Sequence, residues 1–355
     1  MKKTIALILT IVLMLTMFSG CIGTTVVIGE CDHEKESQQP ETPALSEGAV
    51  KTGLAVFTNI ADSTSAAADT DGAAKYDITL AAVTVDEEGV IQSCIIDSIP
   101  ATVNFNAAGE ITSDLSAPVQ TKNELGEAYG MMAWGGAIAE WDQQVAALAA
   151  FAVGKTVEEL KNGAIDESGK APDGSDLASS ATIYLGGYVS AIEAAVANAR
   201  HLGAQGGDEL VLSTLSTLKN STSASAETAG NAQLDSDIAV LTRKDGVITS
   251  CYIDSVQAKI AFDAGGTITT DLSVPVQTKN ELGENYGMVA WGGAAAEWEE
   301  QAAAYARYIT GKTAAEVAGI AVSESTKPAD GTDLASSVTI AIGGFQALIA
   351  KAMQQ

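Results

Sequence analysis

The sequence predicts an α+β fold in which a small antiparallel-sheet domain, with a long helix and a C-terminal helix, occurs twice in tandem. Short apolar runs separated by turn residues open each half of the chain, which is typical of strands joined in a meander. Alanine-rich segments with Trp, Leu and Val at helical spacing follow these runs and indicate helices. Both patterns recur at a nearly constant distance, so we expect the arrangement twice.

The repeat can be aligned residue by residue. Residues 82–192 match residues 239–349 without gaps at an offset of 157 positions. Upstream, Asp62 corresponds to Asn220 at an offset of 158. We therefore expect the first copy to carry one extra residue somewhere before Ala82.

The period predicts where the domains begin and end. A repeat this long indicates a duplicated domain rather than a solenoid unit. With 46% hydrophobic residues, the chain has enough apolar surface to build cores. We expect domains at residues 53–203 and 208–355, with the glycine-rich residues 203–207 as the joint.

Each copy opens with predicted strands. In the first copy we expect them at residues 78–85, 90–96 and 101–105, because Glu-Glu-Gly and Ser-Ile-Pro interrupt the apolar runs. In the second copy Lys244-Asp-Gly246 stands at the first of these turns and is a strong hairpin signal. The strands are expected to form an antiparallel meander.

Each copy continues with predicted helices. Alanine with Trp, Leu and Val at helical spacing predicts one long helix at residues 131–153 and another at residues 288–309. Residues 156–159 (TVEE) and 313–316 (TAAE) match the capping box that opens a helix. The last predicted helices cover residues 183–200 and 340–353.

The first 20 residues indicate export. Lys2 and Lys3 precede an apolar run that ends at Phe18-Ser-Gly before Cys21, an arrangement typical of secretory signals. The string also resembles a bacterial lipobox, which implies cleavage before Cys21 and lipid on that residue. Because several acyl chains anchor a protein firmly, residues 1–20 are expected to be a lipoprotein signal peptide and the protein to lie on the extracytoplasmic face of the cell membrane. The alternative is an ordinary signal peptide with a chance cysteine.

A polar segment follows the predicted anchor. Residues 34–50 contain proline and almost no large apolar side chains, which leaves too little to bury against the entropy of ordering. We therefore expect residues 21–52 to be the lipid anchor and a flexible tether.

The composition excludes several kinds of site. The formal net charge of −26 repels nucleic acid and anionic lipid head groups. The chain has two histidines, His33 and His201, and no Cys-x-x-Cys-His, so neither a metal site nor haem nor a histidine-dependent hydrolase is expected. Cys94 and Cys251 correspond in the repeat and lie in apolar strands, where burial as small hydrophobes is favoured over a bridge between them.

A short motif stands before the last helix of each copy. Residues 176–182 read DLASSAT and residues 333–339 read DLASSVT. They resemble the flavinylation motif of the FMN-binding domain family, Asp-x-x-Ser-Gly-Ala-Thr, in which the final threonine is esterified to the phosphate of FMN. Ser180 and Ser337 stand where that motif has glycine, and Val338 where it has alanine.

The resemblance implies one cofactor site in each copy. It maps Thr182 and Thr339 onto the FMN attachment position, and Asp176 and Asp333 onto the aspartate that the transfer requires. The candidate set also includes the serines of the motif: Ser179, Ser180, Ser336 and Ser337. A phosphate beside the first turn of a helix would meet unpaired N–H groups and the positive end of the helix dipole. The alternative interpretation is that Asp and Ser form a helix N-cap.

The implied function is electron transport by two covalent FMN groups. The family resemblance implies maturation by a separate flavin transferase that uses FAD and Mg²⁺, with a membrane NADH or quinone oxidoreductase as electron donor. The chain would then be a redox carrier that passes electrons to external acceptors, with no substrate pocket of its own. The alternative is a non-enzymatic surface lipoprotein whose duplicated domains bind a ligand or a protein.

Two further features have two interpretations each. Trp134 and Trp141 lie seven residues apart, as do Trp291 and Trp298, so each pair is expected on one face of the long helix, either stacked on flavin or packed in the core. The heptapeptide TKNELGE, which occurs identically in both copies, either bonds a cofactor edge through side chains such as Lys122 or caps the long helix.

Overall fold

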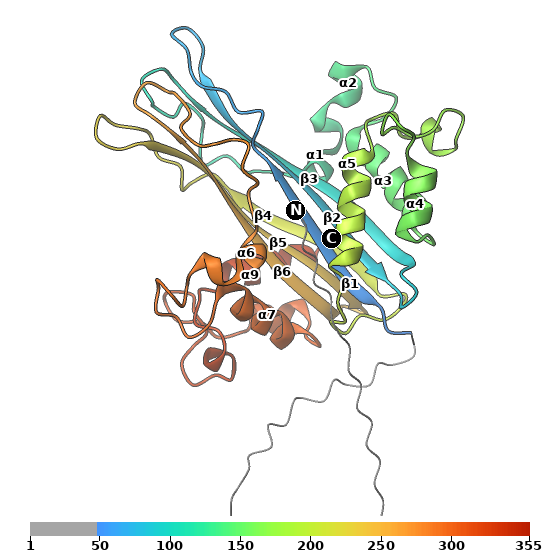
Figure 1. The fold of residues 1–355 in the computed structure, drawn as a ribbon. Coiled ribbons are helices and arrows are strands. Elements are labelled where there is room, and N and C mark those ends of the chain that lie inside the picture. Colours follow the sequence, from blue (N-terminus) through green and yellow to red (C-terminus); the bar gives the residue numbers. More distant parts are fainter. Residues whose placement is uncertain (1–47) are drawn as a thin grey trace, which may run out of the picture. The chain divides into compact units, whose positions relative to one another are not determined.

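Two three-stranded antiparallel sheets organise residues 48–355, the part of the chain that this computed structural model describes (Figure 1). These residues belong to one compact unit. The predictions for the signal peptide, Cys21 and most of the tether lie outside the described residues. The predicted end of the tether at residue 52 is wrong, because Lys51 and Thr52 lie in the first strand, where Thr52 exchanges backbone hydrogen bonds with Arg200. The strands are β1 (Lys51–Asn59), β2 (Gly72–Val85), β3 (Ile91–Phe105), β4 (Glu209–Thr217), β5 (Gly230–Lys244) and β6 (Val247–Phe262). Their order is β1-β2-β3 in one sheet and β4-β5-β6 in the other, so the predicted α+β class is confirmed.

One predicted strand break is wrong. The segments 90–96 and 101–105 belong to a single strand, β3, which runs through Pro100. Pro100 lies opposite Asp77 of β2, and β3 is an edge strand. An edge strand tolerates proline because a missing N–H on its open side removes no ladder hydrogen bond.

The strand register locates the extra residue of the first copy. Val83 lies opposite Cys94, and Leu241 lies opposite Cys251, so β2 and β5 correspond at an offset of 158. The extra residue therefore lies in the turn between β2 and β3, and the predicted place before Ala82 is wrong. From Ala82 to that turn, the gapless match pairs each residue with the neighbour of its structural counterpart.

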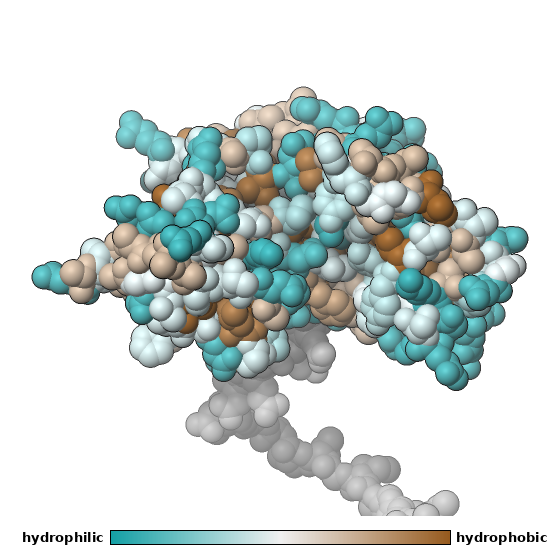
Figure 2. Space-filling view, turned by 90° about the horizontal axis from the view of Figure 1, so that it is seen from above, coloured by the Kyte–Doolittle hydropathy of each residue, from teal (hydrophilic) through white to brown (hydrophobic). Residues whose placement is uncertain are grey.

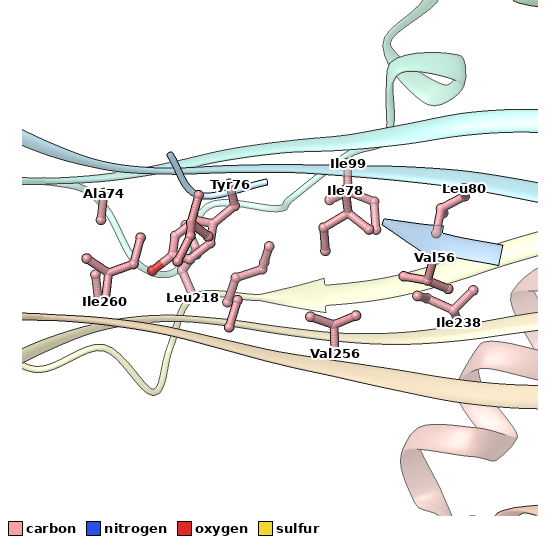
Figure 3. Packing of buried hydrophobic residues seen from close by; sticks show 14 of the residues in the cluster. Val56, Ala74, Tyr76, Ile78, Leu80, Ile99, Leu218, Ile238, Val256 and Ile260 are labelled. Carbon is pink, nitrogen blue, oxygen red and sulfur yellow. The ribbon is translucent and has the colours of Figure 1, made fainter. Parts of the chain in front are cut away.

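The two sheets pack face to face over a shared core (Figure 3). Alternate residues of the strands point into this core, such as Leu54 and Val56 of β1 and Ile238 and Val240 of β5. At one end of it the ring of Phe105 lies on the ring of Phe262. The opposite face of each sheet carries its own apolar cluster under helices.

Helices cover the outer face of each sheet, which gives the order helix, sheet, sheet, helix (Figure 1). The larger helices are α3 (Trp141–Ala152), α4 (Val157–Ala164) and α5 (Gly186–Ala197) on the first sheet and α7 (Trp298–Ile309) and α9 (Gly343–Ala352) on the second. The short ones are α1 (Lys122–Leu125), α2 (Met131–Gly135), α6 (Lys279–Leu282) and α8 (Ala314–Ala318), with 3-10 turns η1 (Gly126–Tyr129), η2 (Leu177–Ser179), η3 (Gly283–Tyr286) and η4 (Leu334–Ser336). The capping boxes at Thr156 and Thr313 are confirmed, and the last helix of each half forms, although later than predicted.

The single long helix predicted at residues 131–153 is wrong, because the chain leaves the helix at Gly136. This glycine has a φ of 64°, a left-handed conformation that glycine adopts without strain. The buried carboxylate of Glu140 then accepts hydrogen bonds from the N–H groups of Met131 and Met132, at 2.8 and 3.1 Å. Residues 288–297 repeat this break, with Glu297 in place of Glu140.

Several contacts between the first half (residues 48–203) and the second half (residues 208–355) occur in reciprocal pairs. The Ala66 N–H donates to the Gly266 carbonyl at 2.8 Å, and the Ala224 N–H donates to the Gly109 carbonyl at 2.7 Å. The same exchange relates two backbone-to-serine bonds: Ile111 to Ser223 and Ile268 to Ser65. In these pairs, when one residue contacts another across the halves, their two counterparts also contact each other, as in an isologous two-fold interface.

The face of the molecule seen in Figure 2 is largely hydrophilic, with small separated apolar patches. Scattered apolar residues of this kind are normal on a protein surface. Among residues 48–355, no helix combines the length and the hydropathy that crossing a bilayer requires.

Candidate functional site

The motif DLASSAT forms a tight turn held at the protein surface by two apolar side chains. Leu177 and Ala181 are buried under the helices of the first half, whereas Asp176 and Thr182 are exposed. The two serines between them, Ser179 and Ser180, are also exposed. The alternation of anchored and exposed residues fixes the backbone and leaves the polar side chains accessible.

The second motif, residues 333–339, has the same arrangement. Leu334 and Val338 are buried, and the polar residues are exposed: Asp333, Ser336, Ser337 and Thr339. Val338 occupies the position of Ala181 without leaving the core, so the larger side chain does not displace the turn.

A buried glutamine holds each motif threonine. The Oε1 atom of Gln144, which is 0% exposed, accepts the Thr182 N–H at 2.8 Å, the Ile183 N–H at 3.2 Å and the Thr182 hydroxyl at 3.4 Å. Its Nε2 group donates to the Ala139 carbonyl at 2.9 Å. The glutamine is therefore fixed at both ends and sets the position of the threonine backbone.

Gln301 does the same in the second half. It accepts the N–H groups of Thr339 and Ile340 at 2.7 and 3.2 Å and the Thr339 hydroxyl at 3.1 Å. Sequence reasoning missed both glutamines. The signal that could have found them is a polar residue on the apolar face of an amphipathic helix, repeated at the offset of 157.

The expected position of Thr182 in the first turn of a helix is wrong. Helix α5 begins at Gly186, four residues later. The N–H groups of Leu185 and Gly186 donate to the Gly169 carbonyl at 2.7 and 3.1 Å. A group on Thr182 would thus lie beside η2 and the start of α3 rather than on the axis of α5.

The motif aspartates are not helix caps. Asp176 and Asp333 make no side-chain cap hydrogen bond, and the residue before each supplies the acceptor instead: the Ser175 hydroxyl accepts the Ala178 N–H at 3.1 Å. Ser179 donates its hydroxyl to the Asp176 carbonyl at 2.6 Å. Within the described residues the two carboxylates are therefore left exposed and without a hydrogen-bond partner.

A cavity of about 250 Å³ lies beside the second motif. It is lined by Ser336, Ser337 and Thr339, and on α7 by Gln301 and Arg307. A guanidinium group recognises phosphate oxygens by charge and paired hydrogen bonds. Arg307 is thus the side chain best suited to hold a phosphate on Thr339; Ala150 occupies its place in the first half.

The tryptophans of each half do not share a helix face. Trp134 and Trp291 are 90% and 87% exposed, whereas Trp141 and Trp298 are buried. The Trp141 indole N–H donates to the Tyr188 hydroxyl at 2.9 Å. The buried indoles therefore pack in the cores, and the break between the predicted helix halves separates them from the exposed ones.

The heptapeptide TKNELGE caps its own short helix. Thr121 and Glu124 form a capping box on α1. Asn123 donates its N–H to the Asp97 carboxylate at 3.1 Å, and burial raises the pKa of Asp97 to about 6. Lys122 is 6% exposed and lies between the rings of Tyr129 and Trp141. These side chains are engaged within the protein.

The remaining candidate groups do not form a reactive site in residues 48–355. Cys94 and Cys251 are free thiols, and burial raises the pKa of each to about 12. His201 pairs with Glu87 at 2.9 Å. In this range no cluster of three or more His, Cys, Asp or Glu side chains could hold a metal ion.

Comparison of the chain with protein-family models finds no match, and neither curated proteins nor solved structures yield a significant relative. The chain is a mixed α+β protein with two antiparallel sheets.

Proposed function

We propose that this chain is an exported, lipid-anchored electron carrier that holds two FMN groups, esterified through their phosphates to Thr182 and Thr339. The anchor would be lipid on Cys21, and the residues between it and β1 would tether the folded part to the extracytoplasmic face of the cell membrane. The proposal rests on the motif resemblance and on how the structure presents the motif.

The observation that carries the proposal is the presentation of the two threonines. Each threonine is exposed at the surface, while a buried glutamine fixes its backbone and accepts its hydroxyl. An enzyme that modifies a folded protein needs such a rigid, accessible acceptor. The same geometry occurs in both halves, with Gln144 and Gln301 in matching roles.

The transfer would join the threonine oxygen to the FMN phosphorus of FAD and break the pyrophosphate bond, so that AMP leaves and the hydroxyl proton is lost. Asp176 and Asp333 lie six residues before the threonines, exposed and unpartnered in the described structure. They are thus available to a transferase and its Mg²⁺. Arg307 would hold the phosphate in the second half. The bound flavin supplies the reversible redox chemistry.

The two halves are proposed to be tandem copies of one domain. The offset along the sequence, the equal strand order and the reciprocal contacts support this. Two copies give two flavin positions in one carrier. A membrane NADH or quinone oxidoreductase would donate electrons, and external acceptors would receive them.

The test is the intact mass of the exported protein after expression with a flavin transferase. We expect two added FMN esters, with one lost in Thr182→Ala, one in Thr339→Ala and both in the double variant. Thr156→Ala, which removes a threonine outside both motifs, is the matched control and should keep both. An unmodified mass, or esters that persist in the double variant, would overturn the proposal.

A duplicated binding protein is the second candidate. It is favoured by the nearly full exposure of Trp134 and Trp291, since exposed aromatic side chains are enriched in binding surfaces. An unmodified mass in the experiment above, together with ligand-dependent quenching of these indoles, would support it.

A further inference from the structure

Two clefts occupy corresponding places in the two halves and differ in size. In the first half a cleft of about 310 Å³ lies between helix α3 and the first part of β3, near Cys94. In the second half the corresponding cleft lies between β6 near Cys251 and helix α7, and it measures about 660 Å³. The larger one, called the large cleft below, extends across to β1 and to residues 198–202 of the first half.

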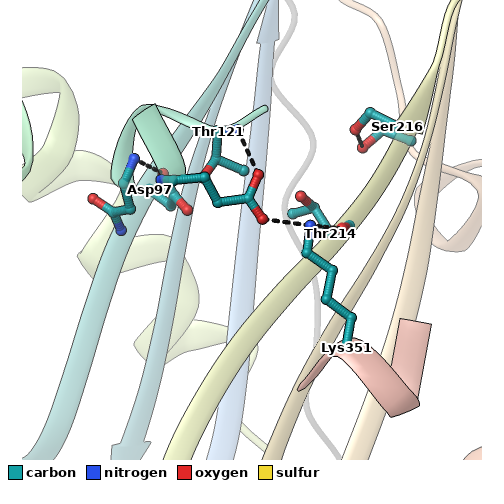
Figure 4. Close-up of polar contacts among 8 residues, drawn as sticks. Asp97, Thr121, Thr214, Ser216 and Lys351 are labelled. Carbon is teal, nitrogen blue, oxygen red and sulfur yellow. Dashed lines mark hydrogen bonds and ion pairs between the residues drawn. The ribbon is translucent and has the colours of Figure 1, made fainter. Parts of the chain in front are cut away.

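Beside the smaller cleft, the region that corresponds to this extension is occupied by a lysine side chain. Lys351, near the end of α9, pairs its ammonium group with the Glu124 carboxylate and donates to the Thr214 carbonyl at 2.7 Å (Figure 4). Glu124 and Thr214 belong to different halves, so this side chain bridges them. The ammonium group thus has a receptor made of one carboxylate and one backbone carbonyl.

The same receptor occurs in the large cleft without its lysine. The counterpart of Glu124 is Glu281, and the counterpart of Thr214 in the strand register is Val56; both line the large cleft. The counterpart of Lys351 is Ala194, which carries no charge. The large cleft therefore contains an ammonium receptor that the chain itself does not fill.

The Val56 carbonyl points away from β2, toward the open edge of β1. Along the open edge of β1, Thr52 exchanges backbone hydrogen bonds with Arg200, and the Leu54 carbonyl accepts Asn198 Nδ2 at 3.1 Å. Carbonyls two residues apart in a strand point to the same edge, so that of Val56 points there too. No donor to it occurs among the described residues.

The charges that line the large cleft are negative in sum, because four carboxylates (Asp254, Glu281, Glu299 and Glu300) stand against two guanidinium groups, Arg200 and Arg307. Glu281 uses Oε2 to accept the Thr278 N–H at 2.9 Å, which leaves Oε1 for a ligand, as Glu124 does for Lys351. Glu299 also lines the large cleft, and its buried Oε2 has no partner among the described residues. A buried carboxylate oxygen without a partner is costly, so a second donor would be bound there.

We infer that the large cleft binds a primary alkylammonium ligand, with one ammonium group between Glu281 and the Val56 carbonyl. A linear diamine fits the donor set best, because its second ammonium group can reach toward Glu299. The receptor at Glu281 and Val56 contains none of the motif residues and does not depend on the flavin proposal, although Arg307 lines both the large cleft and the cavity beside Thr339.

The test is calorimetric titration of the full chain with cadaverine, with pentanol as the uncharged probe. We expect one cadaverine per chain and no binding of pentanol. Glu281→Gln keeps the capping interaction of α6 but removes the charge, so it should weaken binding about tenfold or more. Glu124→Gln is the same substitution at the corresponding place and should leave the single site unchanged.

Two further variants test the symmetry argument. Lys351→Ala should vacate the receptor at Glu124 and raise the stoichiometry from one cadaverine to two. Ala194→Lys should fill the receptor at Glu281 and abolish binding; its folding is checked by its unfolding transition. If Lys351→Ala binds a single cadaverine and Glu281→Gln binds as tightly as the native chain, the inference is overturned.

The ammonium group can come from a free amine or from a lysine of another protein. Titration with Nα-acetyl-lysine methylamide distinguishes these sources. Tighter binding of cadaverine assigns the site to free diamines, and tighter binding of the lysine amide assigns it to a lysine side chain of a peptide. Absence of binding by both compounds overturns the inference.

Discussion

The ring of Phe105 stacks on the ring of Phe262, with centroids 4.1 Å apart and planes 4° from parallel. Each ends the last strand of its sheet, and the two are 157 residues apart. Gly72 and Gly230 lie against the two rings so closely that a Cβ atom would fall within 2.4 and 2.3 Å of a ring carbon. Phe105 and Phe262 correspond in the sequence repeat, so this stack joins equivalent positions of the two halves.

Removal of either ring should destabilise both halves together. Phe105→Ala and Phe262→Ala are each expected to lower the free energy of unfolding by about 3–5 kcal/mol, because a fully buried ring is replaced by a cavity. The double variant should lose less than the sum, because the rings contact each other. Denaturant unfolding measures both effects, with the half-exposed Phe57→Ala as control. Additive losses would show that the two rings are energetically independent.

Cleavage at the joint should leave the halves associated. A protease site inserted between Gln205 and Gly206 would cut the chain beside a short backbone contact, Gly206 to Gly48, while the sheet-to-sheet core stays intact. We expect the cut protein to sediment as one species under native conditions. Two species, each of about half the mass, would mean that the shared core does not hold the halves without the covalent link.

Replacement of the buried glutamine behind a motif should lower the free energy of unfolding. Gln144→Ala leaves the N–H groups of Thr182 and Ile183 without an acceptor, which is expected to cost about 1–3 kcal/mol. Amide exchange at these two positions should accelerate, whereas the exposed Glu167→Gln should change neither quantity. Unchanged exchange in Gln144→Ala would show that another group holds the motif.

The two buried aspartates give a defined pH dependence. Burial raises the pKa of Asp97 and of Asp254 to about 6, from an ordinary value of 3.8. Between these values the folded protein binds protons that the unfolded chain releases, so stability falls as the pH rises through this window and then levels off. The difference corresponds to about 3 kcal/mol for each carboxyl group.

Asparagine tests this dependence, because it keeps an oxygen acceptor for the N–H groups of Ser98 and Asn123. The double variant Asp97→Asn, Asp254→Asn should lose part of the decline between about pH 4 and about pH 8. Denaturant midpoints at both pH values measure it. An equal decline in variant and native protein would assign the dependence to other groups.

The four tryptophans should separate into two classes. Trp134→Ala should change the free energy of unfolding by less than about 0.5 kcal/mol, whereas Trp141→Ala should lower it by about 3–5 kcal/mol. In the native protein acrylamide should quench the indoles of Trp134 and Trp291 and spare the buried pair. Equal quenching of all four would contradict the exposure of Trp134 and Trp291.

The sequence predicts the class of fold and many of its local elements, because those depend on neighbours along the chain. The capping boxes at Thr156 and Thr313 and the hairpin turn at Asp245 are confirmed. The continuous helix at residues 131–153 fails because Gly136 and Glu140 favour a break, which alanine content alone does not reveal.

The packing of one sheet on the other could not be predicted from local patterns. A strand shows which side chains are apolar but not what covers them. The signal lies in residues 80–85 of β2, which are buried on both faces, since such a run requires a layer on each side. Gln144 was missed for a similar reason, because its partners lie 38 and 39 residues away along the chain.

The covalent link between the halves has a consequence for the chemistry of their surfaces. In an assembly of two identical chains every substitution appears on both sides of the axis. Here Lys351 stands on one side and Ala194 on the other, so one gap is closed by the protein's own side chain while its mirror position stays open. Two covalently linked halves of similar fold can thus carry different surfaces, and a substitution in one half leaves the other half unchanged.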